Sequence, residues 1–449
     1  MITTDVVVVG GSAAGLVAAS TGKSNHPDKN FLVIRKDKQA MIPCGIPYVF
    51  GSIESTDKNI LPDALATNSG AEVIIDEVVS IDRKNKICRT KDDKEIKYEK
   101  LVFATGSTPK IPTWLDGADI KNVFTIPKNT EYLNDMMLKL KNCKKIVTIG
   151  GGFIGVEVSD ELKKSGKEVT IVEMLPRILS LAFDDEIAVI AEELLVSNGI
   201  TIRTGIGVEK ILGNGKVTGV KLANGEELIA DAVVLSTGYQ PNIGLAEDAD
   251  LKINDMGFIK VDEYMRTEDP DIYAVGDCAE KRNFITRKSS NVMLASTACA
   301  EARIAGMNLY KLSAVKTFNG TIAIFSTCFG GTGFGAAGLT ESQAIEENFD
   351  IVTGTFEGID RHPGTLQDTH KQLVKLVVAR DSGVILGGEV VGGLSAGELI
   401  NVIGLAIQNR MTINSILTTQ IGTQPLLTAS PAAYPIIKAA EVIAQYKNN

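Results

Sequence analysis

The sequence predicts an α/β protein in which two parallel-sheet domains precede a C-terminal α+β domain. Three observations predict this architecture. An apolar strand, a glycine-rich turn and a helix open the chain at residues 5–20, and the same order returns at residues 145–164. Strands without polar alternation are typical of parallel sheets covered on both faces. After residue 313 the composition changes to strands followed by helices, without a further glycine loop.

The composition excludes several classes of protein. With 449 residues the chain is too long for one core, and its 44% hydrophobic and 22% charged residues are typical of globular domains. A net charge of -9 without a basic stripe disfavours nucleic acid and membrane surfaces as partners. No apolar run reaches the roughly 18 residues of a membrane span, and residues 1–9 predict a buried strand rather than a signal peptide. Six scattered cysteines without a C-x-x-C pair indicate a cytoplasmic location.

The two repeated units and the segment between them can be assigned element by element. The strands, glycine turns and helices of the repeat are Asp5–Val9, Gly10–Gly15, the helix from Leu16 and Phe31–Ile34, then Lys145–Ile149, Gly150–Gly155, Val156–Lys164 and Glu168–Val172. Alternating residues predict a small β layer over Glu72–Ile81, Lys86–Thr90 and Lys97–Thr105. Pro109, Pro112 and Pro127 mark a linker. Strands at Lys216–Leu222 and Ala232–Ser236 close the second unit.

The last segment is expected to form a separate α+β module. Its predicted strands are Gly320–Phe325, Lys371–Ala379 and Val384–Val391, and its predicted helices are Ala396–Asn409 and Ala432–Tyr446.

The first glycine loop has the spacing of a dinucleotide-binding G-x-G-x-x-G motif. Gly10 allows the tight turn, Ser12 replaces the middle glycine but is small enough for a pyrophosphate to approach, and Gly15 lets helix pack on strand. One feature departs from the motif. The next strand ends in Arg35, where an acid normally binds the adenosine ribose hydroxyls.

The second glycine loop is complete. Gly150, Gly152 and Gly155 hold the three motif positions, and Glu173 ends the following strand. A carboxylate there accepts both ribose hydroxyls and repels a 2′-phosphate, which predicts NADH rather than NADPH. Two such loops predict two Rossmann-like dinucleotide-binding domains.

Three further turns follow apolar strands. They are Ala104-Thr105-Gly106-Ser107, Ser236-Thr237-Gly238 and the Gly276-Asp277 turn after Ile272–Val275. An aspartate in the last position can hydrogen-bond the polyol of a bound flavin, although a helix N-cap would also explain it.

Cys44 is the candidate redox residue. It stands in Pro43-Cys44-Gly45-Ile46-Pro47, shortly after the second strand. A cysteine that begins a helix has its pKa lowered by the helix dipole, which favours the reactive thiolate. The other cysteines are interpreted as buried apolar residues, with Cys278 alone close enough to Asp277 to lie near a cofactor.

In this order, the first glycine loop, Cys44-Gly45-Ile46-Pro47, Ala104–Ser107, the second glycine loop with Glu157, and Ala274–Asp277 resemble the single-cysteine pyridine nucleotide–disulfide oxidoreductases. That group contains NADH oxidases, NADH peroxidases, coenzyme A-disulfide reductases and persulfide reductases. The resemblance covers nearly the whole chain, including Gly338–Glu341, Lys375-Leu376, Ile385–Gly388 and Glu398–Ile400. It implies FAD bound by residues 1–113 and 241–317, NAD(H) bound by residues 114–240, and a homodimer formed through residues 318–449.

The resemblance also implies roles for individual residues, with Phe153 swinging off the flavin and Ile154 and Glu157 near the nicotinamide. The expected cofactor-binding residues are Gly10, Ser12, Ala13, Gly15, Arg35, Lys36, Val79, Ala104, Thr105, Gly106, Gly276, Asp277, Ala295, Ser296, Gly150, Gly152, Phe153, Ile154, Gly155, Glu157, Glu173 and Gly238. Cys44 is the expected catalytic residue, and no metal site is expected.

Departures from the family narrow the chemistry. Cys44 has no second cysteine five residues on, and Gln424 replaces the histidine of the dithiol branch. Ala13 stands where oxidases and peroxidases have a histidine, and His362 replaces the tyrosine that precedes Pro-Gly in coenzyme A-disulfide reductases. His26, His362 and His370 are interpreted as surface or loop residues, and Tyr434 is a candidate substrate-side hydroxyl.

The sequence therefore predicts electron transfer from NADH through FAD and Cys44 to a low-molecular-weight disulfide or persulfide, with coenzyme A as the favoured thiol. The alternative is an NADH oxidase or peroxidase that cycles Cys44 through a sulfenate. A non-catalytic NADH-sensing flavoprotein is the third hypothesis, which the Pro-Cys-Gly setting of Cys44 disfavours because a sensor would not need that cysteine.

Overall fold

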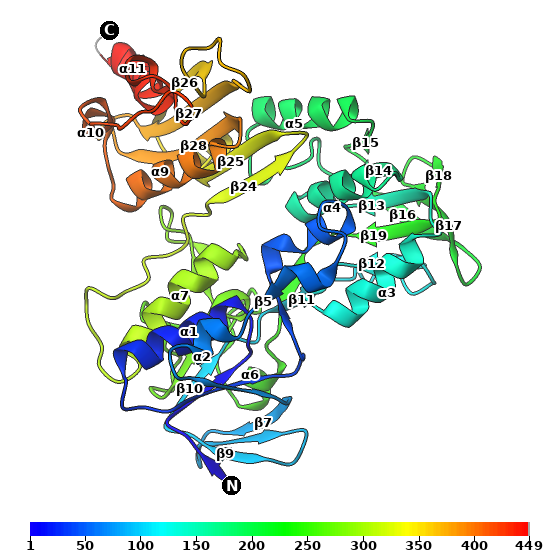
Figure 1. The fold of residues 1–449 in the computed structure, drawn as a ribbon, viewed down its shortest axis with the longest axis vertical. Coiled ribbons are helices and arrows are strands. Elements are labelled where there is room, and N and C mark those ends of the chain that lie inside the picture. Colours follow the sequence, from blue (N-terminus) through cyan, green and yellow to red (C-terminus); the bar gives the residue numbers. More distant parts are fainter. Residues whose placement is uncertain (448–449) are drawn as a thin grey trace.

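A computed structural model, which describes residues 1–447, has the predicted fold class. Two five-stranded parallel sheets are followed by a five-stranded antiparallel sheet with helices. In Figure 1 the first unit lies at the bottom, the second at the right and the C-terminal unit at the top left. Among the described residues, no helix has the length and apolar character that crossing a membrane requires.

The first parallel sheet is built around a strand of four valines. In β2 (Val6–Val9) every side chain is buried, as an internal strand covered on both faces requires. The sheet order is β21 (Ile272–Ala274), β10 (Lys100–Phe103), β2, β3 (Phe31–Arg35) and β6 (Glu72–Ile75). On this sheet α1 (Ala13–Asn25) packs against α7 (Ala295–Asn308), so distant segments complete one core (Figure 1).

The prediction of one small β layer between the repeats is partly wrong. Within Glu72–Ile81 the chain forms two strands, because Asp76 and Glu77 lie between β6 and β7 (Val78–Asp82). Within Lys97–Thr105 it likewise divides into β9 (Glu95–Lys97) and β10. β6 and β10 join the parallel sheet, whereas β1 (Ile2–Thr3), β9, β8 (Ile87–Thr90) and β7 form the small sheet.

The second unit repeats the order of four strands of the first, and differs in its edge strand β12, which precedes the glycine loop in the chain, whereas β21 follows it. Its sheet order is β12 (Val123–Thr125), β19 (Ala232–Leu235), β13 (Lys145–Ile149), β14 (Glu168–Val172) and β15 (Thr201–Arg203), and every pairing is parallel. Its helices are α3 (Thr130–Leu140), α4 (Phe153–Lys164) and α5 (Asp185–Ser197), and its antiparallel sheet contains β16 (Val208–Gly213), β17 (Val217–Leu222) and β18 (Glu227–Ile229). The chain enters and leaves this unit through β11 (Ser107–Pro109) and β20 (Tyr239–Pro241), which pair antiparallel.

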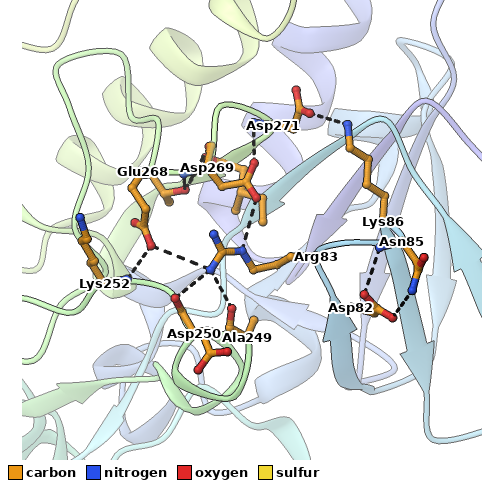
Figure 2. Close-up of polar contacts among 12 residues, drawn as sticks. Asp82, Arg83, Asn85, Lys86, Ala249, Asp250, Lys252, Glu268, Asp269 and Asp271 are labelled. Carbon is orange, nitrogen blue, oxygen red and sulfur yellow. Dashed lines mark hydrogen bonds and ion pairs between the residues drawn. The ribbon is translucent and has the colours of Figure 1, made fainter.

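The segment that returns from the second unit is fixed to the small sheet by ion pairs. Arg83 donates to the carbonyl oxygens of Ala249 and Asp250 at 3.0 and 2.8 Å and to Asp269 at 3.3 Å (Figure 2). Asp271 pairs with Lys86 and, at 2.5 Å, with Lys100. These contacts hold β21 and the turn before it against the small sheet and β10.

The short elements of the first unit are β4 (Ala40–Met41), β5 (Ile60–Leu61), α2 (Ala64–Thr67), α6 (Gly244–Asp248), β22 (Lys281–Arg282) and β23 (Ser289–Ser290).

The C-terminal sheet is antiparallel throughout, in the order β24 (Phe325–Phe329), β25 (Thr332–Gly338), β28 (Ile385–Gly392), β27 (Lys371–Ala379) and β26 (Ile351–Ile359). The predicted strand at Gly320–Phe325 is wrong in position, because positive φ values at Gly320 and Ala323 interrupt extended pairing. β24 starts only at Phe325. The helices of this unit are α8 (Glu341–Glu346), α9 (Ala396–Gln408), α10 (Ile413–Leu417) and α11 (Pro435–Lys447).

A buried lysine joins the second unit to the C-terminal unit. Lys375 of β27 is 3% exposed and pairs with Asp184 at 2.9 Å and Glu341 at 2.7 Å, and also with Glu186. Asp184, which precedes α5, accepts the backbone N–H groups of Glu341 and Ser342 at the start of α8. Burial alone would raise the pKa of Asp184, but Ser342 and Lys375 hold it well below its usual range. The three carboxylates lie close enough together to ligate a cation, and the ammonium of Lys375 pairs with each of them.

Replacement of this lysine tests the contact between the units. Lys375→Met leaves the buried carboxylate of Asp184 without its cation, and we expect a loss of about 3 kcal/mol or more in the free energy of unfolding. Thermal and urea unfolding measure the change. The control is Lys371→Met, on the same strand, whose pair with Glu357 is exposed and should matter little. Equal melting temperatures for Lys375→Met and the wild type would show that the cluster does not stabilise the fold.

Candidate active site

The two glycine loops have the same backbone geometry. Gly10 has a φ of 113° and Gly150 a φ of 106°, values that L side chains rarely adopt. A Cβ added to Gly10 would lie 2.1 Å from the carbonyl oxygen of Ala104, and one added to Gly150 would lie 2.4 Å from that of Ser236. Each first glycine is therefore required because the end of the neighbouring strand passes directly against it.

The third glycine closes each loop. A Cβ added to Gly15 or Gly155 would lie 1.9 Å from the carbonyl oxygen of the first glycine of its own loop. At the middle position, a Cβ on Gly152 would meet nothing within 4 Å, which explains why Ser12 is tolerated in the first loop. Both loops lead directly into a long helix, and this arrangement fits the pyrophosphate of a dinucleotide.

The acid after the second loop lies against that loop. The carboxylate of Glu173, which follows β14, accepts the backbone N–H of Gly151 at 2.6 Å and that of Leu175 at 2.8 Å. The corresponding residue of the first unit, Arg35, is 6% exposed and forms a bidentate ion pair with Asp63. The two loops therefore share their glycine geometry and differ in the charge beside them.

Asp277 lies in a polar cluster at the carboxyl end of β21. Its carboxylate accepts the hydroxyl of Ser107 and the ammonium of Lys128, both at 2.7 Å. Burial alone would raise the pKa of Asp277, but Lys128 and Ser107 lower it below its usual range. Asp277 is therefore an ionised acceptor at neutral pH. Sequence reasoning missed Lys128, which belongs to no motif and whose one local signal is the neighbouring linker residue Pro127.

Cys44 is exposed and lies in a three-residue 3₁₀ turn, Pro43–Gly45. The predicted lowering of its pKa by a helix dipole is wrong, since so short a turn has no appreciable macrodipole. The surrounding protein instead raises the pKa of the Cys44 thiol by desolvation, and Glu157, Cys299 and Asp277 raise it further. Lys128 acts in the opposite direction.

Glu157 connects this site to the C-terminal unit. Its carboxylate, on α4, accepts the hydroxyl of Thr327 at 2.8 Å, and burial raises its pKa to about 7. One turn earlier, Phe153 stacks on Phe325 with ring centroids 5.1 Å apart. Thr327 and Phe325 both belong to β24, so this strand fixes the start of α4.

The electrostatic neighbours of Cys44 come from four separate parts of the chain. Glu157 lies on α4, Lys128 precedes α3, Asp277 follows β21, and Cys299 lies half-buried on α7. Sequence reasoning interpreted Cys299 as a core residue, and no local signal marks it. The fold thus gathers an exposed thiol, two carboxylates and an ammonium at one place.

The remaining predicted residues have mixed locations. Ala295 and Ser296 begin α7, Ala104–Gly106 follow β10, and Gly276 precedes Asp277. Ile154, in the first turn of α4, packs against a buried apolar cluster. Lys36 and Val79 are exposed, and Tyr434 packs half-buried against the core of the C-terminal unit. Gly238 has a φ of 98° in the turn after β19. His362 and His370 lie in hydrogen-bonded loops, whereas His26 stacks edge-on against Tyr310.

Comparison with known families gives a consistent result over most of the chain. Residues 4–302 match the model described as pyridine nucleotide-disulphide oxidoreductase. Residues 324–433 match the dimerisation domain of the same group.

Individual relatives fall into two groups by name. An NADH oxidase of Methanocaldococcus jannaschii is 32% identical over 97% of both chains. An NAD(P)H coenzyme A polysulfide/persulfide reductase of Pyrococcus horikoshii is 30% identical over 98% of both. Among solved structures, an NAD-dependent persulfide reductase from A. fulgidus is 32% identical, with a TM-score of 0.91 over 99% of this chain and 84% of that one.

Proposed function

We propose, because the chain belongs to the pyridine nucleotide–disulphide oxidoreductase family, that it carries electrons from NADH through FAD and Cys44 to a low-molecular-weight disulfide or persulfide. The matches to this family confirm the predicted family. They also confirm the general class of reaction, that of an NAD(P)H-dependent flavin oxidoreductase. The single observation that supports the sulfur substrate is the exposed Cys44 thiol, placed among charged groups at the meeting point of the units. Coenzyme A is the favoured thiol.

The cofactor assignment follows the geometry of the two loops. The loop at Gly10, with the ionised Asp277 nearby, would hold FAD, and the loop at Gly150, with Glu173, would hold NADH. We accordingly assign residues 1–113 and 241–317 to the FAD domain and residues 114–240 to the NAD(H) domain. FAD bound at the first loop would supply two-electron redox chemistry, with a hydride accepted from the nicotinamide and two electrons delivered to sulfur.

The proposed chemistry at Cys44 is thiol–disulfide exchange. The Cys44 thiolate attacks one sulfur of R–S–S–R, a new S–S bond forms, and RS⁻ leaves and takes up a proton. Two electrons from NADH then cleave this mixed disulfide, which returns the Cys44 thiolate and a second thiol. Lys128 favours the thiolate, and Glu157 opposes it only while ionised. With a pKa of about 7, Glu157 is partly neutral at physiological pH, which reduces this opposition.

An NADH oxidase or peroxidase is the second candidate function. The name of the M. jannaschii relative favours it. In that case Cys44 would be oxidised to a sulfenate by peroxide or oxygen. Reduction of a sulfenate releases hydroxide, and a nearby acid would assist its departure. This chain has Ala13 where the resemblance places a histidine in the first loop of oxidases, so that acid is missing. We therefore favour the sulfur acceptor.

We further propose a homodimer in the cytoplasm. The match to a dimerisation domain supports the dimer, and residues 318–449 are assigned to it. Exposed Leu405 on α9 and exposed Leu426 and Leu427 in the loop before α11 would be covered in such an assembly. The six cysteines are all free thiols, which supports a reducing compartment.

Cys44→Ser tests the route of the electrons. Hydride transfer from NADH to the flavin should continue at close to the wild-type rate, whereas disulfide or persulfide reduction should fall by about 100-fold or more, because the nucleophile is gone. Stopped-flow absorbance separates the two half-reactions. Cys328→Ser, at a half-buried cysteine of β24, is the matched control. Disulfide reduction by Cys44→Ser at the wild-type rate would reject the proposed role.

Glu173→Ala tests the choice of nicotinamide. The wild type should prefer NADH over NADPH by about tenfold or more in kcat/KM, since about 1.4 kcal/mol of repulsion of the 2′-phosphate suffices. The variant should narrow this ratio, while Glu168→Ala, at the exposed start of the same strand, should leave it unchanged. Equal kcat/KM values for both coenzymes in the wild type would contradict the assignment.

A further inference from the structure

Arg35 uses every donor of its guanidinium within the first unit. Its Nε donates to the carbonyl oxygen of Asp37 at 2.8 Å. Nη1 donates to the carbonyl oxygen of Gly11 at 3.2 Å and to Asp63 Oδ1 at 2.5 Å. Nη2 donates to the carbonyl oxygen of Lys38 at 3.0 Å and to Asp63 Oδ2 at 3.1 Å. An arginine has five N–H groups, and all five have partners here.

This saturation excludes two roles for Arg35. It has no N–H left to donate to a ribose hydroxyl, and none to bind a 2′-phosphate. Because the side chain of Arg35 is also only 7% exposed, Arg35 supports the loop from inside the protein and does not contact a ligand.

Arg35 occupies the position in the first unit that Glu173 occupies in the second. A Cβ added to Gly151 would lie 3.2 Å from the Cβ of Glu173, and one added to Gly11 would lie 2.9 Å from the Cβ of Arg35. The two side chains therefore leave their strands at equivalent points. Glu173 ends in a carboxylate beside its loop, whereas Arg35 holds the carboxylate of another residue, Asp63, at the end of its guanidinium.

The topology brings Asp63 to the correct edge of the sheet. Asp63 directly precedes α2, and α2 leads into the start of β6, which pairs parallel with β3. The start of α2 must therefore lie at the carboxyl edge of the sheet, where the glycine loop and the end of β3 also lie. Asp63 Oδ1 and the carbonyl oxygen of Gly11 both bond to Nη1 of Arg35, which confirms that they are close.

Asp63 keeps free acceptor capacity. Each carboxylate oxygen accepts one N–H from Arg35, and an ionised carboxylate offers about four acceptor sites in total. Its side chain is 38% exposed, so the remaining lone pairs can reach a ligand. A carboxylate with two available oxygens suits the adjacent 2′- and 3′-hydroxyls of a ribose.

We propose that Asp63, held in place by Arg35, supplies the carboxylate that binds the adenosine ribose hydroxyls of the dinucleotide at the first glycine loop. Arg35, which stands where the motif has an acid, thus holds Asp63, whose carboxylate takes the place of that acid. The site would accept a ribose with free hydroxyls, as in FAD, and would repel a 2′-phosphate. This proposal rests on the assignment of FAD to the first loop.

The test compares FAD with its analogue carrying 2′-deoxyadenosine. Dissociation constants are measured by quenching of flavin fluorescence when each is added to the flavin-free, full-length chain. The wild type should bind the analogue about tenfold more weakly, since one hydrogen bond to a charged acceptor is lost. In Asp63→Asn and Asp63→Ala this ratio should fall towards one. Asp57→Asn, an exposed acid of the same segment, should keep the wild-type ratio.

The ratio separates binding from support. If Asp63 only stabilised the loop, its variants would bind FAD and the analogue more weakly by the same factor and keep the wild-type ratio, which would overturn the proposal. A wild type that does not distinguish the two flavins would also overturn it. Failure of the wild type to bind any FAD would instead reject the assignment of FAD to this loop.

Discussion

Both nucleotide sites depend on the close approach of the glycine loop to the backbone at the end of the neighbouring strand. At Gly10 and Gly150 the space for a Cβ is taken by a carbonyl oxygen, and at Gly15 and Gly155 it is taken by the loop itself. This contact fixes where α1 and α4 begin. The start of α4 in turn carries Phe153 and Glu157, which β24 holds through Phe325 and Thr327. The position of Glu157, one of the charged neighbours of Cys44, therefore depends on a backbone constraint that only glycine satisfies.

The electrostatic environment of Cys44 is set by residues from distant parts of the chain. A thiol in so short a turn gains no help from a helix dipole. Desolvation by the surrounding protein, together with Glu157, Cys299 and Asp277, raises its pKa. Lys128 is the group that opposes this effect, and it also binds Asp277. These groups thus favour the protonated form of the thiol. Its reactivity should depend on the protonation of Glu157, whose pKa of about 7 lies in the physiological range.

The fold class could be predicted from the sequence because its signals are local. The valine run of β2 and the glycine spacing of both loops each specify one element and its neighbour. The division of residues 72–81 between two sheets could not be predicted, since alternation does not say which strand will be the partner. The pKa of Cys44 and the pairing of Arg35 with Asp63 could not be predicted from the sequence either. Each depends on residues that only the folded chain brings together.

The electron acceptor distinguishes a disulfide or persulfide reductase from an NADH oxidase or peroxidase. The acceptor is tested most directly by one NADH-driven assay of the FAD-loaded chain in which coenzyme A disulfide, coenzyme A persulfide, glutathione disulfide, peroxide and oxygen are compared by kcat/KM. Thiolates leave without much help from an acid, whereas a departing oxygen needs general acid assistance that is typically worth about 100-fold or more. A coenzyme A disulfide or persulfide should therefore exceed peroxide and oxygen by at least about tenfold. A higher kcat/KM for oxygen or peroxide than for every sulfur acceptor would contradict the account.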